Sequence, residues 1–160
     1  CGLGNPGKEY IDTRHNIGFA LIDKLVSFYN FISYKKDSKK EIFKGVINNN
    51  SCFLLKPLNF MNLSGLPIRE VMNFYKIEKN RLFIIHDDLD LELGKVKVKV
   101  GGGNGGHNGL SNIDEMIGND YYRIRIGIDH PGEKHLVSTG LRVRDPWIIE
   151  SLHPRKLQRS

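Results

Sequence analysis

The sequence has little cysteine and no long apolar run. Cys1 and Cys52 are its two cysteines, too few for a disulfide framework and without the spacing of a metal site. No stretch approaches the roughly 20 consecutive apolar residues that a membrane-spanning helix needs, and no signal-peptide pattern is present. These absences exclude a disulfide-built secreted domain, and we expect a cytoplasmic protein with no membrane partner.

Acidic residues are also in the minority. Asp and Glu number 18 against 24 Lys and Arg, which gives a formal net charge of +6 over 160 residues. This excess of positive charge favours an anionic partner such as nucleic acid, although it does not bear on the fold. The length corresponds to one domain, and the hydrophobic share of 39% is enough for an ordinary core.

Periodic apolar residues predict alternating helices and strands. Ile17, Leu21, Leu25 and Phe28 recur at helical spacing, and 82–86 is a continuous apolar run typical of a buried strand. The predicted helices cover 16–31, 64–75 and 108–117, the predicted strands cover 1–3, 41–47, 52–56, 82–86, 95–100 and 122–128, and 34–40 is expected to be a lysine-rich loop. This alternation predicts an α/β fold, a single-domain three-layer sandwich with a mixed, mostly parallel twisted sheet flanked by helices.

A glycine run follows the fifth of these predicted strands. Residues 101–110 read GGGNGGHNGL, with six glycines around one histidine and two asparagines. Glycines let the backbone approach a ligand closely and adopt positive φ at little steric cost. A flexible linker is the alternative, but linkers are usually serine-rich and carry no His-Asn pair. We therefore expect this run to form part of a binding or catalytic site.

Polar side chains stand at the ends of the predicted elements. Asn5, His15, Asn62, Asp87 and Asn108 all occupy such positions, and ligands of open α/β sheets bind beyond the carboxyl ends of strands. Any one asparagine here is more often a structural cap. Together, a histidine base, an orienting carboxylate and several carboxamides suit hydrolysis of an activated acyl bond by water. The chain has no G-x-S-x-G nucleophile motif.

Two other motifs are weaker. The stretch 2–7 matches G-x-G-x-x-G with Asp23 downstream, but its proline and the residues after it do not open a helix at the glycines, as a dinucleotide site requires. The acidic run 86–90 could attract Mg²⁺, yet no second acidic cluster faces it, and Asp87 is better explained as the partner of His15. We expect neither a metal nor a cofactor.

Four segments resemble the successive signatures of the bacterial peptidyl-tRNA hydrolase family. They read GLGNPGKEYIDTRHNIGF, KPLNFMNLSG, HDDLDLELGKVKVKVGGGNGGHNGL and YYRIRIGIDHPG, and they extend from residue 1 to about residue 132. The resemblance implies a monomeric, cofactor-free esterase. Such an enzyme cleaves the ester between a peptide and the 3′-terminal ribose of tRNA, and so recycles tRNA from aborted translation.

The resemblance also implies roles for individual residues. His15 would activate water, Asp87 would orient and stabilise His15, Asn5 would help to recognise N-blocked substrates, and Asn108 would hold the substrate or the water. The expected substrate-binding residues are Tyr10, Phe60 and Asn62 around the peptide and the tRNA end, Met61 at the pocket floor, and Lys99 and Arg125 at the tRNA 5′-phosphate.

The alternating segment 95–100 supports an RNA partner from the residues themselves. Its lysines, with Arg123 and Arg125 expected nearby, would form a basic surface for phosphates. Lysines also protect edge strands from pairing with other chains, and both interpretations can hold together.

The chain departs from the family pattern at three places. The family usually begins several residues earlier, so the first strand, expected to be central, is mostly missing, and Asn59 stands where threonine is usual. We expect a family-like domain over 1–135 and a divergent basic tail over 136–160, without the C-terminal helices that bind the acceptor stem. A non-catalytic RNA-binding homologue is the main alternative, disfavoured by the intact pair of His15 and Asp87. A hydrolase of another small ester or amide is disfavoured by the basic surface.

Overall fold

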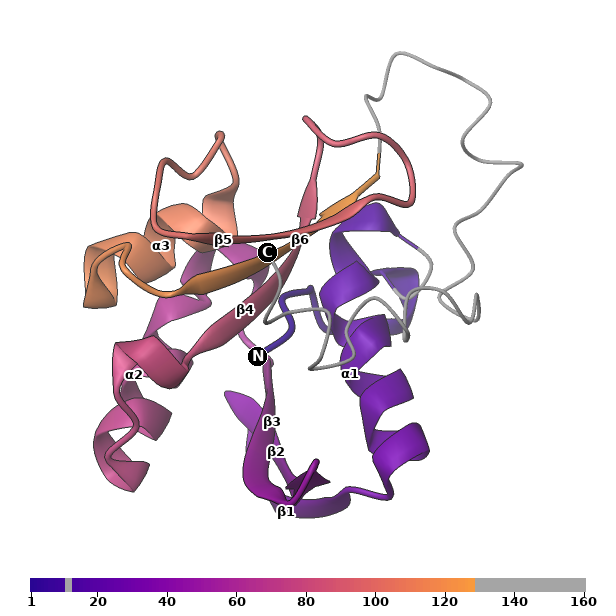
Figure 1. Cartoon of the computed structure of the whole chain (residues 1–160), viewed down its shortest axis with the longest axis vertical. Coiled ribbons are helices and arrows are strands. Elements are labelled where there is room, and N and C mark those ends of the chain that lie inside the picture. Colours follow the sequence, from indigo (N-terminus) through magenta and orange to yellow (C-terminus); the bar gives the residue numbers. More distant parts are fainter. Residues whose placement is uncertain (11–12, 129–160) are drawn as a thin grey trace.

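The computed structural model describes residues 1–10 and 13–128, which form an α/β fold (Figure 1). The sequence predicted this class. The described elements are α1 (Ile17–Tyr29), α2 (Gly65–Tyr75), α3 (Asn108–Ile117), β1 (Ile32–Lys36), β2 (Lys40–Ile47), β3 (Asn50–Pro57), β4 (Phe83–Asp88), β5 (Val96–Val100) and β6 (Tyr122–Gly127), with short 3-10 turns at Lys8–Tyr10, Arg14–Asn16, Met61–Leu63 and Lys79–Arg81. The predicted tail over 136–160, and its boundary at 135, lie outside the described residues.

The strands form two three-stranded sheets joined by the start of the chain. One sheet has the order β1-β2-β3 and is antiparallel, and the other has the order β4-β6-β5, with β4 and β6 parallel and β5 antiparallel to β6. Gly2 forms a parallel bridge with Ile85, and its N–H donates to the carbonyl of Leu55 at 3.0 Å. Residues 1–3 therefore lie between β3 and β4, as expected for the end of a central strand.

The mixed sheet is confirmed, but two details of the prediction need correction. Antiparallel pairings outnumber parallel ones among the described strands, so the sheet is not mostly parallel. The segment 34–40 is not a loop throughout, because β1 pairs with β2 through Lys36. Every residue of β1 is exposed, so its sequence has no buried positions to produce an apolar alternation, and only the partner strand reveals it.

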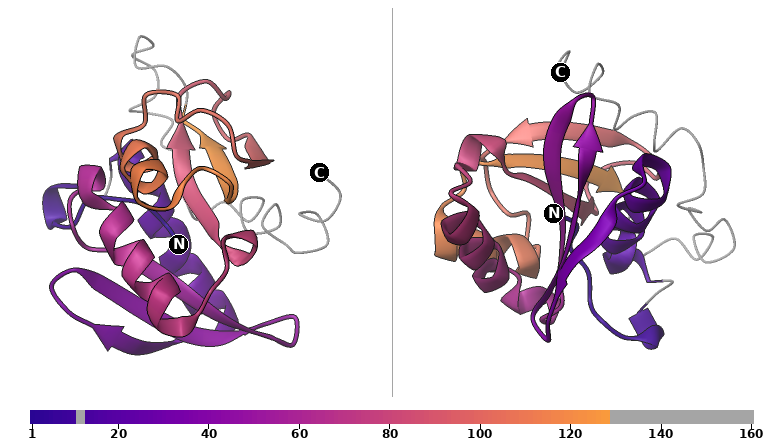
Figure 2. Two further views of the ribbon diagram at one scale, coloured as in Figure 1. Left: turned by 90° about the vertical axis from the view of Figure 1, so that its left-hand side faces the viewer. Right: turned by 90° about the horizontal axis from the view of Figure 1, so that it is seen from below.

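The helices cover opposite faces of the sheets. Figure 2 shows α2 and α3 on one side of the strands and α1 on the other. Two apolar clusters fill the layers: the first contains Leu3, Ile84 and Ile113 with residues of α2, and the second contains Leu21, Ile22 and Ile126 with other residues of α1. None of the described helices is long and apolar enough to cross a membrane.

One glycine brings α1 against the strands. A Cβ at Gly18 would overlap the backbone of Leu3 and the carbonyl oxygen of Ile85. Because only hydrogen occupies that position, the first turn of α1 lies directly on residue 3 and β4. This contact places His15, just before α1, next to the carboxyl end of β4.

Candidate active site

The centre of the site is Asp87, near the carboxyl end of β4. Its side chain is 4% exposed, and each carboxylate oxygen contacts a histidine. Oδ2 lies 2.7 Å from Nδ1 of His15, and Oδ1 lies 2.7 Å from Nε2 of His107. Three segments that are far apart in the sequence thus meet at one buried carboxylate. The pair of His15 and Asp87 was expected from the sequence, whereas the contact of His107 with Asp87 was not.

Backbone contacts determine which nitrogens carry protons. The N–H of Leu110 donates to Nδ1 of His107 at 3.2 Å, so His107 caps α3 and holds its proton on Nε2. That Nε2–H then donates to Asp87. His15 donates from Nδ1 to the other oxygen, which leaves its Nε2 lone pair available on a side chain that is 52% exposed. The arrangement presents a correctly oriented base to whatever occupies the site.

The charges of this network support each other. Burial alone would raise the pKa of Asp87, but the hydrogen bonds from His107 and His15 overcome it and hold that pKa well below its usual range. The hydrogen bond to Asp87 in turn raises the pKa of His15 above 6.5, against the opposing effect of partial burial. Asp87 is therefore a carboxylate at neutral pH and makes His15 a stronger base.

His86 packs beneath this network. It is 3% exposed, its Nδ1 lies 2.7 Å from the backbone oxygen of Asp87, and its ring meets that of His107 edge-on at 5.3 Å. Burial lowers the pKa of His86 to about 4. His86 is thus a neutral structural support at physiological pH, and no other described residue bonds its Nε2.

Asn5 is held by a second asparagine, Asn16, for which no signal is present in the sequence. The carboxamide of Asn16, 4% exposed, accepts from the backbone N–H of Asn5 at 2.7 Å and donates to its carbonyl at 2.8 Å. The Oδ1 of Asn5 then accepts from the N–H of Met61 at 2.6 Å.

The structure does not support the dinucleotide motif at 2–7. The glycine turn leads into a three-residue 3-10 helix, not the α-helix of a dinucleotide site, and Asp23 pairs with Lys56.

A cavity of about 360 Å³ runs from the histidines under the glycine loop. His15, Asp87 and His107 line one part of it, and Asn108 also lines it. Asn108 was expected to hold the substrate or the water. It is exposed at the first position of α3 and makes no side-chain hydrogen bond to His15 or Asp87 within the described residues, so the direct contact from this loop comes from His107.

The cavity is lined by none of the four residues expected to bind the peptide and the RNA end, which are Tyr10, Phe60, Met61 and Asn62. The rings of Tyr10 and Phe60 meet edge-on with centroids 6.3 Å apart, and Phe60 is 55% exposed. Met61 is buried, and its sulfur would collide with a Cβ at Gly109. Asn62 is exposed on the turn that follows β3. The exposed ring of Phe60, paired with the partly buried ring of Tyr10, is a surface on which an apolar group or a base can pack.

The cavity contains basic residues from β5 and β6, as the sequence predicted. In the antiparallel register Lys99 is opposite Arg123 and Lys97 is opposite Arg125. Arg123 is buried and bound to Asp114 at 3.1 Å, while Nε of Arg125 donates to Asp88 at 2.7 Å. Lys99 forms no ion pair with any described residue. The two arginines are therefore partly committed to carboxylates, and Lys99 is not.

One side-chain group has the proximity that a metal site needs. The donor atoms of His15, Asp87 and His107 lie within 4.8 Å of one another. Each histidine nitrogen in this group already donates a proton to Asp87, so a cation would have to displace both protons. The acidic run 86–90 does not converge either, because Asp88 binds Arg125 and the N–H of Asp90. These contacts favour a hydrogen-bond network over a metal centre.

Comparisons with known proteins agree with the geometry. The family model described as peptidyl-tRNA hydrolase matches residues 1–141. The chain is 50% identical over 133 residues to the peptidyl-tRNA hydrolase of Wolbachia pipientis wMel, covering 83% of this chain and 73% of that protein. It is 51% identical over 138 residues to that of Rickettsia prowazekii, covering 86% and 75%. The crystal structure of peptidyl-tRNA hydrolase from Acinetobacter baumannii superposes with a TM-score of 0.78 at 42% identity, covering 88% of this chain and 72% of that one. The chain belongs to the peptidyl-tRNA hydrolase family.

Proposed function

We propose that this chain hydrolyses the ester between the peptide and the 3′-terminal ribose of peptidyl-tRNA, using water activated by His15. The observation that carries the proposal is the free Nε2 lone pair of His15, fixed by Asp87 beside a cavity that contains Lys99 and Arg125. A base for water and cations for phosphate belong together in a hydrolase of an RNA ester. The names of the relatives support the same substrate.

In the proposed reaction His15 takes a proton from water at Nε2 while the water oxygen attacks the ester carbonyl. Asp87 stabilises the imidazolium that forms, and His107 keeps Asp87 in place through the second oxygen. The tetrahedral intermediate then collapses, the bond from the carbonyl carbon to the 3′-oxygen breaks, and the proton on His15 passes to that oxygen. The products are a free peptide acid and tRNA with an intact 3′-hydroxyl, so no cofactor enters the balance.

The remaining residues would bind the substrate. Asn5 and Asn108 would supply uncharged hydrogen bonds to the peptide end and to the developing oxyanion. Tyr10, Phe60, Met61 and Asn62 would contact the peptide and the terminal nucleotides, and Lys99 and Arg125 the 5′-phosphate of the acceptor stem. The proposed enzyme works as a monomer without a metal in the cytoplasm, the compartment that this substrate implies.

Release of the peptide from N-acetylated aminoacyl-tRNA tests the proposal. The chain is expected to release it, and His15→Ala is expected to lower kcat by about 100- to 10,000-fold, the range for loss of a general base. Activity that does not change in His15→Ala would contradict the role of His15. Binding of tRNA without any release would instead favour the alternative, a non-catalytic RNA-binding homologue.

A further inference from the structure

Two residues that the proposed chemistry leaves unused touch the cations of the cavity. Asp88 binds Arg125, and Gly102 lies under the side chain of Lys99. We propose that Asp88 and Gly102 are positioning residues that hold Arg125 and Lys99 ready for a terminal phosphate of the RNA. The inference rests on the proposed function for its substrate, but its geometry stands on these contacts.

Asp88 orients the guanidinium of Arg125. The Nε–H of Arg125 donates to Oδ2 at 2.7 Å, and the other carboxylate oxygen accepts from the N–H of Asp90 at 2.8 Å. With both oxygens bound, the carboxylate cannot rotate freely. It occupies one edge of the guanidinium and leaves the two terminal nitrogens without a partner among the described residues. Those nitrogens form the planar fork that binds phosphate through two parallel hydrogen bonds.

Gly102 leaves room for the side chain of Lys99. Its φ is 93°, and a Cβ there would overlap Nζ and Cε of Lys99. The ammonium group thus lies over the bare backbone, and any larger residue would push it aside. Lys99 is opposite Arg123 in the register, and Arg125 is two residues further along the same strand. Lys99 and Arg125 are therefore diagonal neighbours on one sheet face, close enough for long side chains to reach one anion.

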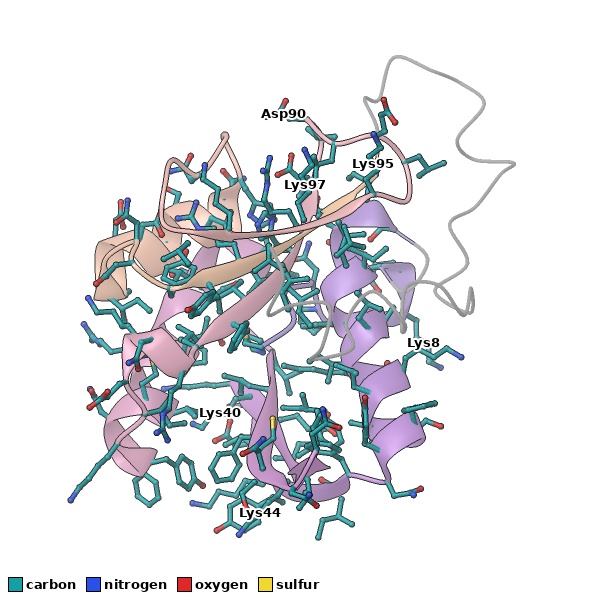
Figure 3. The ribbon with its side chains drawn as sticks, in the orientation of Figure 1. Lys8, Lys40, Lys44, Asp90, Lys95 and Lys97 are labelled. Carbon is teal, nitrogen blue, oxygen red and sulfur yellow. The ribbon has the colours of Figure 1, made fainter. Side chains whose placement is uncertain are left out.

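Two carboxylates near Lys99 and Arg125 limit which anions these two cations would bind. Asp88 offsets part of the charge of Arg125, and Asp90 lines the same cavity with an exposed carboxylate. Asp90 and Lys97 lie at one end of the molecule and Lys44 lies at the opposite end (Figure 3). Because these carboxylates lower the net charge around Lys99 and Arg125, the site would bind a phosphate mainly through oriented hydrogen bonds. A terminal phosphate carries about −1.5 to −2 charge and three acceptor oxygens, so it can engage both cations, whereas an internal phosphodiester carries a single charge.

The test compares two RNA hairpins that mimic an acceptor stem, one with a 5′-phosphate and one with a 5′-hydroxyl. Fluorescence anisotropy gives Kd for each, and matched N-acetylated aminoacyl-tRNAs give KM and kcat. The wild-type chain is expected to prefer the 5′-phosphate. Asp88→Ala and Gly102→Ala should each reduce that preference by about ten-fold, the effect of losing one oriented charged hydrogen bond. Binding of the 5′-hydroxyl hairpin should stay within about two-fold.

Matched variants separate positioning from a general loss of structure. Gly101 has φ 66°, and the nearest atom to a Cβ there is the carbonyl oxygen of Asn119 at 3.6 Å, so Gly101→Ala adds backbone strain without displacing Lys99. It should keep the phosphate preference. Asp88→Asn keeps an acceptor for Nε of Arg125 and should restore most of it. Asp90→Asn removes an opposing charge and should strengthen binding of the phosphorylated hairpin.

Several results would overturn the inference. Equal losses for both hairpins in Asp88→Ala would show a purely structural role, and equal losses in Gly101→Ala and Gly102→Ala would show backbone strain alone. A wild-type chain without phosphate preference would refute the proposal directly. Because binding is measured without turnover, a chain that keeps the preference but releases no peptide would refute the proposed hydrolase and leave this inference standing.

Discussion

Removal of His107 should affect stability and catalysis by different amounts, because its two ring nitrogens serve different partners. Nδ1 caps α3 by accepting from the N–H of Leu110, and Nε2 donates to the buried carboxylate of Asp87. Loss of an N-cap costs about 1 kcal/mol, and loss of a hydrogen bond to a charged group costs about 1.5–3 kcal/mol. His107→Ala should therefore lower the free energy of unfolding by about 2.5–4 kcal/mol.

His107→Asn separates the two effects. Asparagine is a good N-cap but is too short to replace the imidazole at Asp87, so the variant should lose about 1.5–3 kcal/mol only. Urea unfolding followed by circular dichroism measures both variants. The Tm of His107→Ala should fall by about 5–15 °C for a chain of this length.

The pH dependence gives an independent readout. With His107 gone, Asp87 has one donor fewer, so its charge acts more strongly on His15 and should raise the pKa of His15 further. Because the base must be unprotonated, the acid limb of kcat/KM should move to higher pH. The reasoning is refuted if His107→Asn is as stable as the wild-type chain, or if the limb moves to lower pH.

Three further predictions follow from the same contacts. Asp87→Asn removes the carboxylate that raises the pKa of His15, so the acid limb of kcat/KM should move to lower pH while kcat falls about 100-fold or more; an unmoved limb contradicts this role. Burial lowers the pKa of His86 from 6.5 to about 4. As the pH falls from 6.5 to 4, His86 takes up a proton in the unfolded chain before it does so in the folded chain. The free energy of unfolding should therefore fall by about 3 kcal/mol over this range. In His86→Phe, the free energy of unfolding measured with urea should change less steeply with pH over this range. An unchanged pH dependence would exclude His86 as the cause. Gly18→Ala should cost about 1–3 kcal/mol of stability through the collision with Leu3, and an unchanged Tm would show that α1 is free to shift.

Local patterns in the sequence predicted most elements of the fold. The helix expected at 108–117 has those bounds in α3, and the helix expected at 64–75 begins one residue later, at Gly65, in α2. The strands expected at 41–47 and 52–56 correspond to β2 and β3, and Asn48 and Asn49 between them have positive φ. In each case the signal lies within a few residues, such as an apolar period, a cap or a turn former. β1 had no such signal, since it is exposed and depends on β2.

The features of the candidate site also divide into those that the sequence predicted and those that only the tertiary structure revealed. From the sequence alone, His15, Asp87 and the glycine run were predicted to carry the chemistry, because these residue types at element ends suit hydrolysis and match a family. Only the tertiary structure decided that His107 shares Asp87 with His15. That contact needs three distant segments to meet at one buried carboxylate, and no sequence spacing encodes their separation. The glycine run was expected to form part of a binding or catalytic site, whereas the contact between its Gly102 and the side chain of Lys99 is visible only in the tertiary structure.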